Sequence, residues 1–416
     1  MGIFTLIMLG LGLAMDATIG QNGLEAAYDT LLRGRDGQLQ INVGLDGVTR
    51  ETMQTSTPVP GCTLVLTLDA DLQKTLQTAL QNQMDTLRTT KGIGAGREVR
   101  AGAAVVVDVR TGGILAAASL PDFDLSRYRS DYAALSADST APLLDRVCQG
   151  LYAPGSAFKP AVAAAALTAG IAPAATVNCT GKYFYYSNYH PGCLQYGHRG
   201  PVDLRTALEY SCNIFFYDAG RRVGIDMLGQ YARALGLGEK TGIELAGEQA
   251  GVVAGPEYTA SVGGTWYEGS VLSAAIGQEN NRFTPLQLAH MVATLVGGGD
   301  RWQVHLLQKV AGEAPREKVR LGKVNLSPGN VAAIKEGMLA VTQSGSLAAA
   351  FQSLPVQVGA KTGSAQVDGE ETSNAVLVCF APYEDPEIAL AVVVEQGGSG
   401  SSLGTVAAQV IQAYVQ

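Results

Sequence analysis

The stretch Ser156-Ala157-Phe158-Lys159 constrains this chain most, because nowhere else does a serine precede a lysine by three residues. Tyr152 to Gly155 breaks regular structure before it, and Pro160 to Leu167 after it predicts a buried, alanine-rich helix that ends at Gly170. Residues three apart share one face of a helix, with Cβ atoms about 5–6 Å apart. Such a hydroxyl and amine can act as nucleophile and base if burial or a nearby cation lowers the pKa of the lysine.

Taken alone, a serine and a lysine at this spacing are more often structural than catalytic. The serine then belongs to the first turn of a helix, and the lysine side chain lies in solvent. Two further patterns change this interpretation. Ser211-Cys212-Asn213 is the sole Ser-x-Asn of the sequence, and Lys361-Thr362-Gly363-Ser364 follows it. Ser-x-x-Lys, Ser-x-Asn and Lys-Thr-Gly in this order form the signature of serine acyl-transferases that act on D-alanyl-D-alanine and on β-lactams.

On these motifs the chain resembles the transpeptidase domain of the penicillin-binding proteins, and most of all the class B, monofunctional kind. The resemblance covers roughly residues 57–416. Besides the three motifs it includes Gly61 to Leu72, Ala103 to Asp124, Leu151 to Pro160, Ile276-Gly277-Gln278 with Thr284-Pro285, and Gly359 to Gln366.

The resemblance implies the role of each motif residue. Ser156 attacks the carbonyl of the penultimate D-alanine and Lys159 accepts its proton. Ser211 relays a proton to the departing amine, and the amide of Asn213 binds the substrate backbone.

The third motif is expected to bind the terminal carboxylate. Lys361 supplies positive charge and, by repulsion, helps to keep Lys159 neutral. Thr362 and Ser364 hydrogen-bond the carboxylate, and Gly363 leaves the strand open to the substrate. The resemblance places the oxyanion between the backbone N–H groups of Ser156 and Ser364. This chemistry requires no metal and no cofactor.

Two other motifs compete with this assignment. Lys240-Thr241-Gly242 repeats the third motif, but its flanks read as a polar turn, whereas Lys361 has strand-like flanks. Gly400-Ser401-Ser402-Leu403-Gly404 matches a nucleophile elbow, yet no acid or histidine follows Ser402 to complete a triad. The histidines lack a triad context, so we interpret them as loop or packing residues; they are His190, His198, His290 and His305.

The cysteines leave three possibilities open. Cys179 and Cys193 bracket a loop rich in Tyr, Gly and Asn, which favours a disulfide in an oxidising compartment. Cys179, His190, Cys193 and His198 could instead bind zinc, although their spacing fits no standard site. Free thiols are the third possibility, and none of the three affects the chemistry above.

Hydrophobic periodicity predicts the scaffold. A helix is expected over 69–87, a hairpin around Thr111-Gly112, and one helix from Val202 to Phe216. Further helices are expected over 284–296, 327–341 and 405–415, with strands over 356–367, 375–380 and 388–394. These elements predict an α+β fold: an antiparallel five-stranded sheet covered by helices, with an inserted, mostly helical lobe at about 160–295. The resemblance implies the β-lactamase/transpeptidase-like version of this fold.

Residues 1–56 are expected to be the remnant of an N-terminal pedestal, and 57–416 the penicillin-binding transpeptidase domain. The apolar run from Ile3 to Met15 has 13 residues, too few for a bilayer span of about 20, and no basic residue precedes it. The interpretation that requires no membrane or secretion role is that this run is a buried strand or helix. The chain is expected to be a shortened family member or one whose upstream part is missing here. Its location at the extracytoplasmic face of the cytoplasmic membrane is therefore implied by the family alone.

Composition argues against two classes of protein, disordered proteins and proteins that bind nucleic acid. Hydrophobic residues make up 47% and charged residues 16%, which is typical of a globular protein rather than a disordered one. The net charge of −8, without a basic cluster, argues against nucleic acid as a partner.

Three functions fit the sequence. The first is a DD-transpeptidase that cross-links peptidoglycan stem peptides and is acylated by β-lactams, with a membrane glycan polymerase as the partner that the resemblance implies. The second is a hydrolase of the same fold, either a DD-carboxypeptidase or a β-lactamase. The third is a non-catalytic β-lactam sensor or scaffold.

Overall fold

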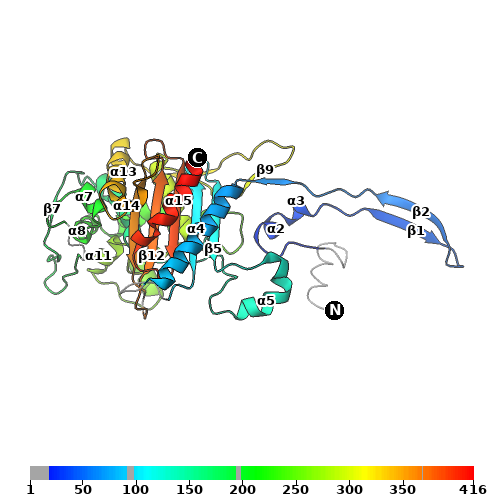
Figure 1. Ribbon diagram of the computed structural model, residues 1–416, viewed down its shortest axis with the longest axis horizontal. Helices are drawn as coiled ribbons and strands as arrows, with labels where there is room; N and C mark the ends of the chain where they lie inside the picture. The colour runs from blue at the N-terminus through cyan, green and yellow to red at the C-terminus, as the bar shows by residue number, and fades with distance from the viewer. Residues whose placement is uncertain (1–17, 91–97, 194–197, 368) are drawn as a thin grey trace. The chain divides into compact units, whose positions relative to one another are not determined.

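The structure is a computed structural model that describes residues 18–90, 98–193, 198–367 and 369–416 (Figure 1). The run from Ile3 to Met15 lies outside these residues. The chain divides into two compact units. The first unit contains the described residues up to Leu66 together with Glu244–Gly247 and Leu306–Glu317, and the second contains the remainder.

The first unit is built from short elements. Helices α2 (Gly23–Ala27) and α3 (Asp29–Leu32) precede an antiparallel hairpin of β1 (Gln38–Val43) and β2 (Thr49–Ser56). Strand β3 (Leu64–Leu66) pairs with β9 (Leu307–Val310), so this unit draws on two distant parts of the chain. Within the described residues, we find no helix that is both long enough and apolar enough to span a bilayer.

A five-stranded antiparallel sheet organises the second unit. Its order is β11 (Gly359–Ala365), β12 (Asn374–Ala381), β13 (Ile388–Val394), β4 (Gly102–Asp108) and β5 (Ile114–Leu120). β12 and β13 are buried along their whole length. Unbroken Val, Ala, Ile and Leu runs suit such strands because both faces of the sheet are covered.

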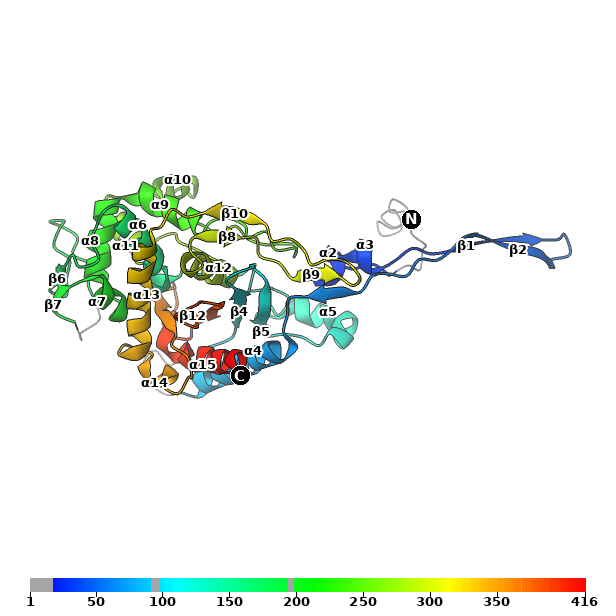
Figure 2. The same cartoon turned by 90° about the horizontal axis from the view of Figure 1, so that it is seen from above.

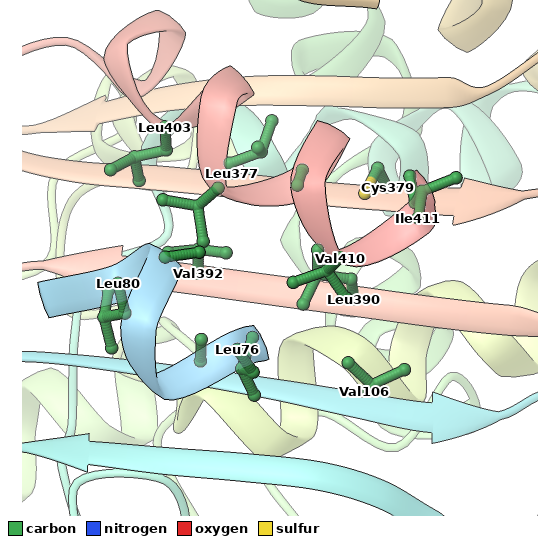
Figure 3. Close-up of a cluster of buried hydrophobic side chains, with 14 of the residues drawn as sticks. Leu76, Leu80, Val106, Leu377, Cys379, Leu390, Val392, Leu403, Val410 and Ile411 are labelled. Atoms are coloured by element: carbon green, nitrogen blue, oxygen red, sulfur yellow. The ribbon is translucent and has the colours of Figure 1, made fainter. Parts of the chain in front are cut away.

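Helices α4 (Ala70–Thr89) and α15 (Gly404–Val415) cover one face of this sheet (Figures 1 and 3). Asp69 caps α4 by accepting hydrogen bonds from the N–H groups of Asp71 and Leu72. The side chains of Leu76 and Leu80 then pack against Leu390 and Val392 of the sheet in one apolar cluster.

Helix α12 (Pro285–Val296) lies on the opposite side of the sheet from α4 and α15 (Figure 2), and every one of its residues is buried. Its first turn carries a complete capping box formed by Thr284 and Gln287. The lobe between β5 and α12 is mostly helical. It contains η2 (Gly155–Phe158), α6 (Lys159–Thr168), β6 (Val177–Cys179), β7 (Gly200–Val202), α7 (Leu204–Glu209), α8 (Asn213–Val223), α9 (Ile225–Ala234), α10 (Pro256–Ser261) and α11 (Ser270–Ala275). Before them, η1 (Leu125–Arg127) and α5 (Tyr128–Ala137) lie apart from the lobe, on the β5 side of the sheet (Figures 1 and 2).

The remaining elements of the second unit follow α12. They are β8 (Asp300–Trp302), β10 (Arg320–Lys323), α13 (Pro328–Gln343), α14 (Ala348–Phe351) and η3 (Gly400–Leu403). The predicted five-stranded sheet, its covering helices and an inserted, mostly helical lobe are therefore confirmed. The predicted lobe at about 160–295 included most of α12, which instead packs on the sheet (Figure 2). The prediction of one helix from Val202 to Phe216 is wrong, because residues 210–212 separate α7 from α8.

Truncating the core beneath α4 is expected to destabilise the second unit. Leu76 is fully buried, so Leu76→Ala should lower the free energy of unfolding by about 2–5 kcal/mol through lost burial and a cavity. Leu125→Ala is the matched control, since this leucine is 78% exposed. Urea denaturation followed by fluorescence measures both variants; equal midpoints for the two would contradict the assigned core.

Candidate active site

Ser156 lies in a short 3-10 helix, η2, directly before α6. The backbone N–H of Lys159 donates to the carbonyl of Ser156, which closes the turn that carries both residues. In a 3-10 helix residues three apart are eclipsed, so the two side chains leave the same side of the chain. Pro160 occupies the first turn of α6, where its missing N–H costs no helical hydrogen bond.

Three glycines let this turn lie against neighbouring backbone. The N–H of Gly155 donates to the carbonyl of Gly277 (3.0 Å). A Cβ at Gly155 would lie 3.0 Å from the carbonyl oxygen of Ser364, and one at Gly363 only 2.5 Å from that of Pro154. The turn and strand β11 therefore touch along their main chains. Gly363 is needed for this contact, a packing reason that sequence reasoning did not supply.

The second motif lies in the turn between α7 and α8. The N–H of Cys212 donates to the carbonyl of Ala207 (2.9 Å), and that of Ser211 to the carbonyl of Leu208 (3.3 Å). This pair of bonds is a Schellman motif, in which the residue after the helix cap adopts the left-handed conformation. Ser211 takes that place with φ of 56°. Because glycine usually occupies it, the sequence carried no helix-stop signal.

Lys159 joins the first motif to the second. Its Nζ donates to the carbonyl oxygen of Ser211 (2.8 Å), to Oδ1 of Asn213 (2.7 Å) and to Oγ of Ser211 (3.1 Å). No hydrogen bond links Nζ to Oγ of Ser156 among the residues described. A lysine that has lost a proton keeps two N–H groups and one lone pair. In that state the Ser211 hydroxyl can donate to the lone pair of Nζ instead of accepting a hydrogen bond from an N–H of Nζ.

Both motif lysines are fully buried. Burial lowers the pKa of Lys159 to about 7, although negative charge on Cys193 and Cys212 acts in the opposite direction. Burial, assisted by the positive charge of Lys159, holds the pKa of Lys361 well below its usual value. We predicted that Lys361 would keep Lys159 neutral. In the structure desolvation is the main cause for both lysines, and the repulsion acts on Lys361.

The three motifs meet at a groove of about 420 Å³. Ser156 lines it together with Ser211 and Asn213 from the turn before α8, and Thr362, Gly363 and Ser364 from β11. Lys361 is turned inward on the same strand, and its Nζ donates to the carbonyl of Thr362 (3.0 Å). The fold thus gathers at one groove segments that are far apart in the sequence.

Sequence reasoning missed other residues that line the groove. The carboxylate of Glu209 lies there, bound to the hydroxyl of Ser344 (2.6 Å) and to Arg205 (3.0 Å). Ser399 and Ser401 line it from the start of η3. No local pattern marks Glu209 or Ser399, and the elbow pattern that includes Ser401 points to a different chemistry. Tertiary packing brings these residues to the groove.

Neither competing motif supplies the nucleophile or the base of this site. Lys240-Thr241-Gly242 forms an irregular turn in which Glu248 accepts from the N–H and Oγ1 of Thr241 (2.6 Å each). The predicted elbow is η3, which contributes a groove wall. His290 is buried in α12 against the carbonyl of Trp302 (2.8 Å), and burial lowers its pKa to about 4.

The cysteines agree with the third of the sequence-based alternatives, in which no disulfide forms. All six cysteines lie in the described part of the chain, and each carries a reduced thiol, so the structure contains no Cys179–Cys193 disulfide. Cys179, Cys193 and His198 do come together, but the fourth member of the cluster is Cys212 and not His190. His190 packs on the ring of Phe184 instead. These four side chains are the set in the described residues that could hold a metal ion.

Comparison with known proteins agrees with this geometry. The family model for the penicillin-binding protein transpeptidase domain matches residues 102–415. The family model for the penicillin-binding protein dimerisation domain matches residues 9–66. The peptidoglycan D,D-transpeptidase MrdA of Escherichia coli K12 is 31% identical over 94% of this chain. The chain spans only 64% of the length of that relative.

Solved structures agree as well. Pseudomonas aeruginosa PBP2, in complex with WCK 5153, is 31% identical with a TM-score of 0.80, over 95% of this chain and 84% of that one. A chain from a peptidoglycan synthase complex, described as coordinating polymerization and crosslinking, is 31% identical with a TM-score of 0.87, over 98% and 72%. With both domains matched and the three motifs gathered at one groove, this chain belongs to the class B penicillin-binding proteins.

Proposed function

We propose that this protein is a serine DD-transpeptidase that cross-links peptidoglycan stem peptides and is acylated by β-lactams at Ser156. The observation that carries the proposal is that the three sequence motifs lie together at one groove. Ser156, Ser211, Asn213 and Thr362 line one groove, and the buried Lys159 is hydrogen-bonded to the second motif. The similarity to the E. coli relative, which is named a peptidoglycan D,D-transpeptidase, supports this activity for the present chain.

In the proposed acylation, Oγ of Ser156 attacks the carbonyl carbon of the penultimate D-alanine while its proton passes to the lone pair of Lys159. The N–H groups of Ser156 and Ser364 stabilise the oxyanion, a role supported by the contact between the backbones of Gly155 and Ser364. The C–N bond then breaks, and the Ser211 hydroxyl donates its proton to the departing D-alanine amine. Lys159 returns a proton to Ser211.

The third motif and Asn213 hold the donor peptide in this scheme. Thr362 and Ser364 hydrogen-bond the terminal carboxylate, whose charge raises the pKa of Lys361 and lets it become an ammonium. The amide of Asn213 binds the peptide backbone. An amine of a second stem peptide then attacks the ester and releases Ser156. With a β-lactam the leaving nitrogen stays attached to the acyl group, so the adduct persists.

The setting of the reaction is also a proposal. We expect the protein to act at the extracytoplasmic face of the cytoplasmic membrane beside a membrane glycan polymerase. The solved relative from a peptidoglycan synthase complex supports such a partner. We further propose that residues 1–56 belong to a pedestal region, in line with the match of residues 9–66 to the dimerisation domain.

Labelling with fluorescent penicillin tests the proposed function. Wild-type protein should form a stable adduct on Ser156, and Ser156→Ala should abolish it because the substitution removes the oxygen that attacks the acyl carbon. Ser402→Ala is the control, since this serine belongs to the competing elbow motif and is expected to keep full labelling. A wild-type adduct lost within seconds would favour a β-lactamase, and labelling that survives in Ser156→Ala would refute the assigned nucleophile.

The rate of acylation should depend on pH through Lys159. The pKa of Lys159 in the folded protein is about 7. At lower pH the amine is therefore mostly protonated and cannot accept the proton of Ser156. The second-order rate constant should therefore fall about tenfold per pH unit below pH of roughly 6 and level off above pH of roughly 8. Lys159→Arg, which stays charged, should not label at any of these pH values. Stopped-flow acylation measures this, and a flat profile from acid to neutral pH would contradict the role of Lys159.

The two Lys-Thr-Gly sequences provide a matched pair for the carboxylate site. Lys361→Ala should lower the acylation rate constant for penicillin by about 10²-fold, because a buried charge partner of the carboxylate is lost. Lys240→Ala removes an exposed lysine outside the groove and should leave the rate unchanged. Equal effects of the two substitutions on the acylation rate constant would show that Lys361 does not bind the carboxylate.

A further inference from the structure

A carboxylate lines the catalytic groove and has no role in the mechanism proposed above. Among the described residues that line the groove, Glu209 is the one with an acidic or basic side chain. The others carry a hydroxyl group, an amide or no side chain. Glu209 is only 7% exposed, and glutamates are rarely buried this deeply unless they are paired.

The partners of Glu209 do not cancel its charge. Oε1 accepts a hydrogen bond from the hydroxyl of Ser344 (2.6 Å), and Oε2 accepts one from Nη1 of Arg205 (3.0 Å). Nε of Arg205 also lies 3.6 Å from Oε1 of Glu336. One positive charge therefore serves two carboxylates, which leaves a net charge of −1 on the three side chains. A carboxylate has about four lone-pair sites, so Glu209 can accept further hydrogen bonds.

The position of Glu209 in the chain is a poor one for stabilising its own helix. It is the last residue of α7, and the C-terminal end of a helix carries partial negative charge. Arg205 precedes Glu209 by four residues, and a basic residue before an acidic one is the weaker order for such a helix pair. The carboxylate and the helix end together make this wall of the groove attractive to a cation.

The same wall lies beside the path of the amines in the proposed reaction. Glu209 precedes Ser211 by two residues, and both line the groove. In the proposed mechanism the hydroxyl of Ser211 gives a proton to the D-alanine amine that departs. Transfer to the second stem peptide reverses this step with a different amine, so the acceptor nitrogen must also approach Ser211.

We propose that Glu209 determines specificity for the acceptor, because its carboxylate binds the ammonium form of the acceptor amine and holds it beside the acyl-enzyme on Ser156. This inference rests on the proposed function and identifies the second substrate as a primary alkylamine that is charged in solution. Such an amine, with a pKa near the lysine value of about 10.4, is almost fully protonated at neutral pH. A hydrogen bond between an ammonium and a carboxylate is roughly twice as strong as one between neutral groups.

The acceptor must lose two protons between binding and product. The first passes from the ammonium to solvent and leaves a neutral amine. The nitrogen then forms a bond to the acyl carbon while its second proton passes through the hydroxyl of Ser211 to the lone pair of Lys159. The bond between the acyl carbon and Oγ of Ser156 breaks, and this oxygen takes the proton from Lys159. Because the carboxylate stabilises the ammonium and not the neutral amine, Glu209 acts on the KM of the acceptor rather than on kcat.

Transfer from a D-alanyl thioester donor to two acceptors tests this role. One acceptor is a stem-peptide fragment with a side-chain amine, and the other is the matching alkoxyamine, which is nucleophilic but uncharged at neutral pH. Glu209→Gln should raise the ratio of the amine KM to the alkoxyamine KM about tenfold. A change in groove shape alone would affect both acceptors equally and leave the ratio unchanged, which would overturn the proposal.

Glu336→Gln is the matched control for the loss of a carboxylate. Glu336 shares Arg205 with Glu209, but its side chain is 61% exposed and does not line the groove. An exposed ion pair contributes little, so the KM ratio should change less than about twofold. Equal changes in the two variants would assign the effect to Arg205 and would contradict binding of the acceptor by Glu209.

Wild-type protein tests the site without a variant that could misfold. A guanidinium analogue of the amine acceptor stays charged and cannot attack the ester. It should compete with the amine at least about tenfold more strongly than the N-acetylated analogue, which is uncharged. Equal inhibition by the two analogues, in protein that the thioester still acylates, would overturn the acceptor site alone. Wild-type protein that neither the thioester nor penicillin acylates would refute the proposed function and, with it, this inference.

Discussion

The burial of Lys159 is the constraint on which the rest of this site depends. An amine at the surface would be charged at neutral pH and could not accept a proton from an alcohol. Alanine-rich α6 has side chains too small to keep neighbouring helices away, so nine of its residues, Lys159 included, are buried. Desolvation brings the pKa of the amine to about 7. The cost of this burial is offset by three acceptors, all from Ser211 and Asn213.

Because those acceptors come from one turn, the geometry of that turn decides whether the base is held in place. The Schellman motif at Ser211 directs the carbonyl and hydroxyl of one residue at the lysine and starts α8 at Asn213. On the other side of the groove, Gly155 and Gly363 let the nucleophile turn rest on β11. The reactive alcohol and the third motif are thereby fixed by main-chain contacts, which long side chains could not achieve as rigidly.

The sequence predicted the sheet well because its strands are continuous apolar runs with clear ends, as in Ala375 to Phe380. It predicted the motif residues because their spacing is specific. It failed where conformation depends on tertiary contacts. Ser211 adopts a glycine-like conformation with no glycine present, and Glu209, Ser399 and Ser401 reach the groove through packing. Cys212 joins a cluster whose other members come from an earlier stretch of the chain, residues 179–198, so spacing pointed to His190 instead.

The central claim is that the folded protein holds Lys159 as a largely neutral amine near physiological pH. Selective ¹³C labelling of the lysine side chains, with Lys159 assigned from the Lys159→Arg variant, allows its titration to be followed directly by NMR. The account predicts a midpoint near pH 7 for this lysine. A midpoint near the ordinary lysine value of about 10.4 would contradict it.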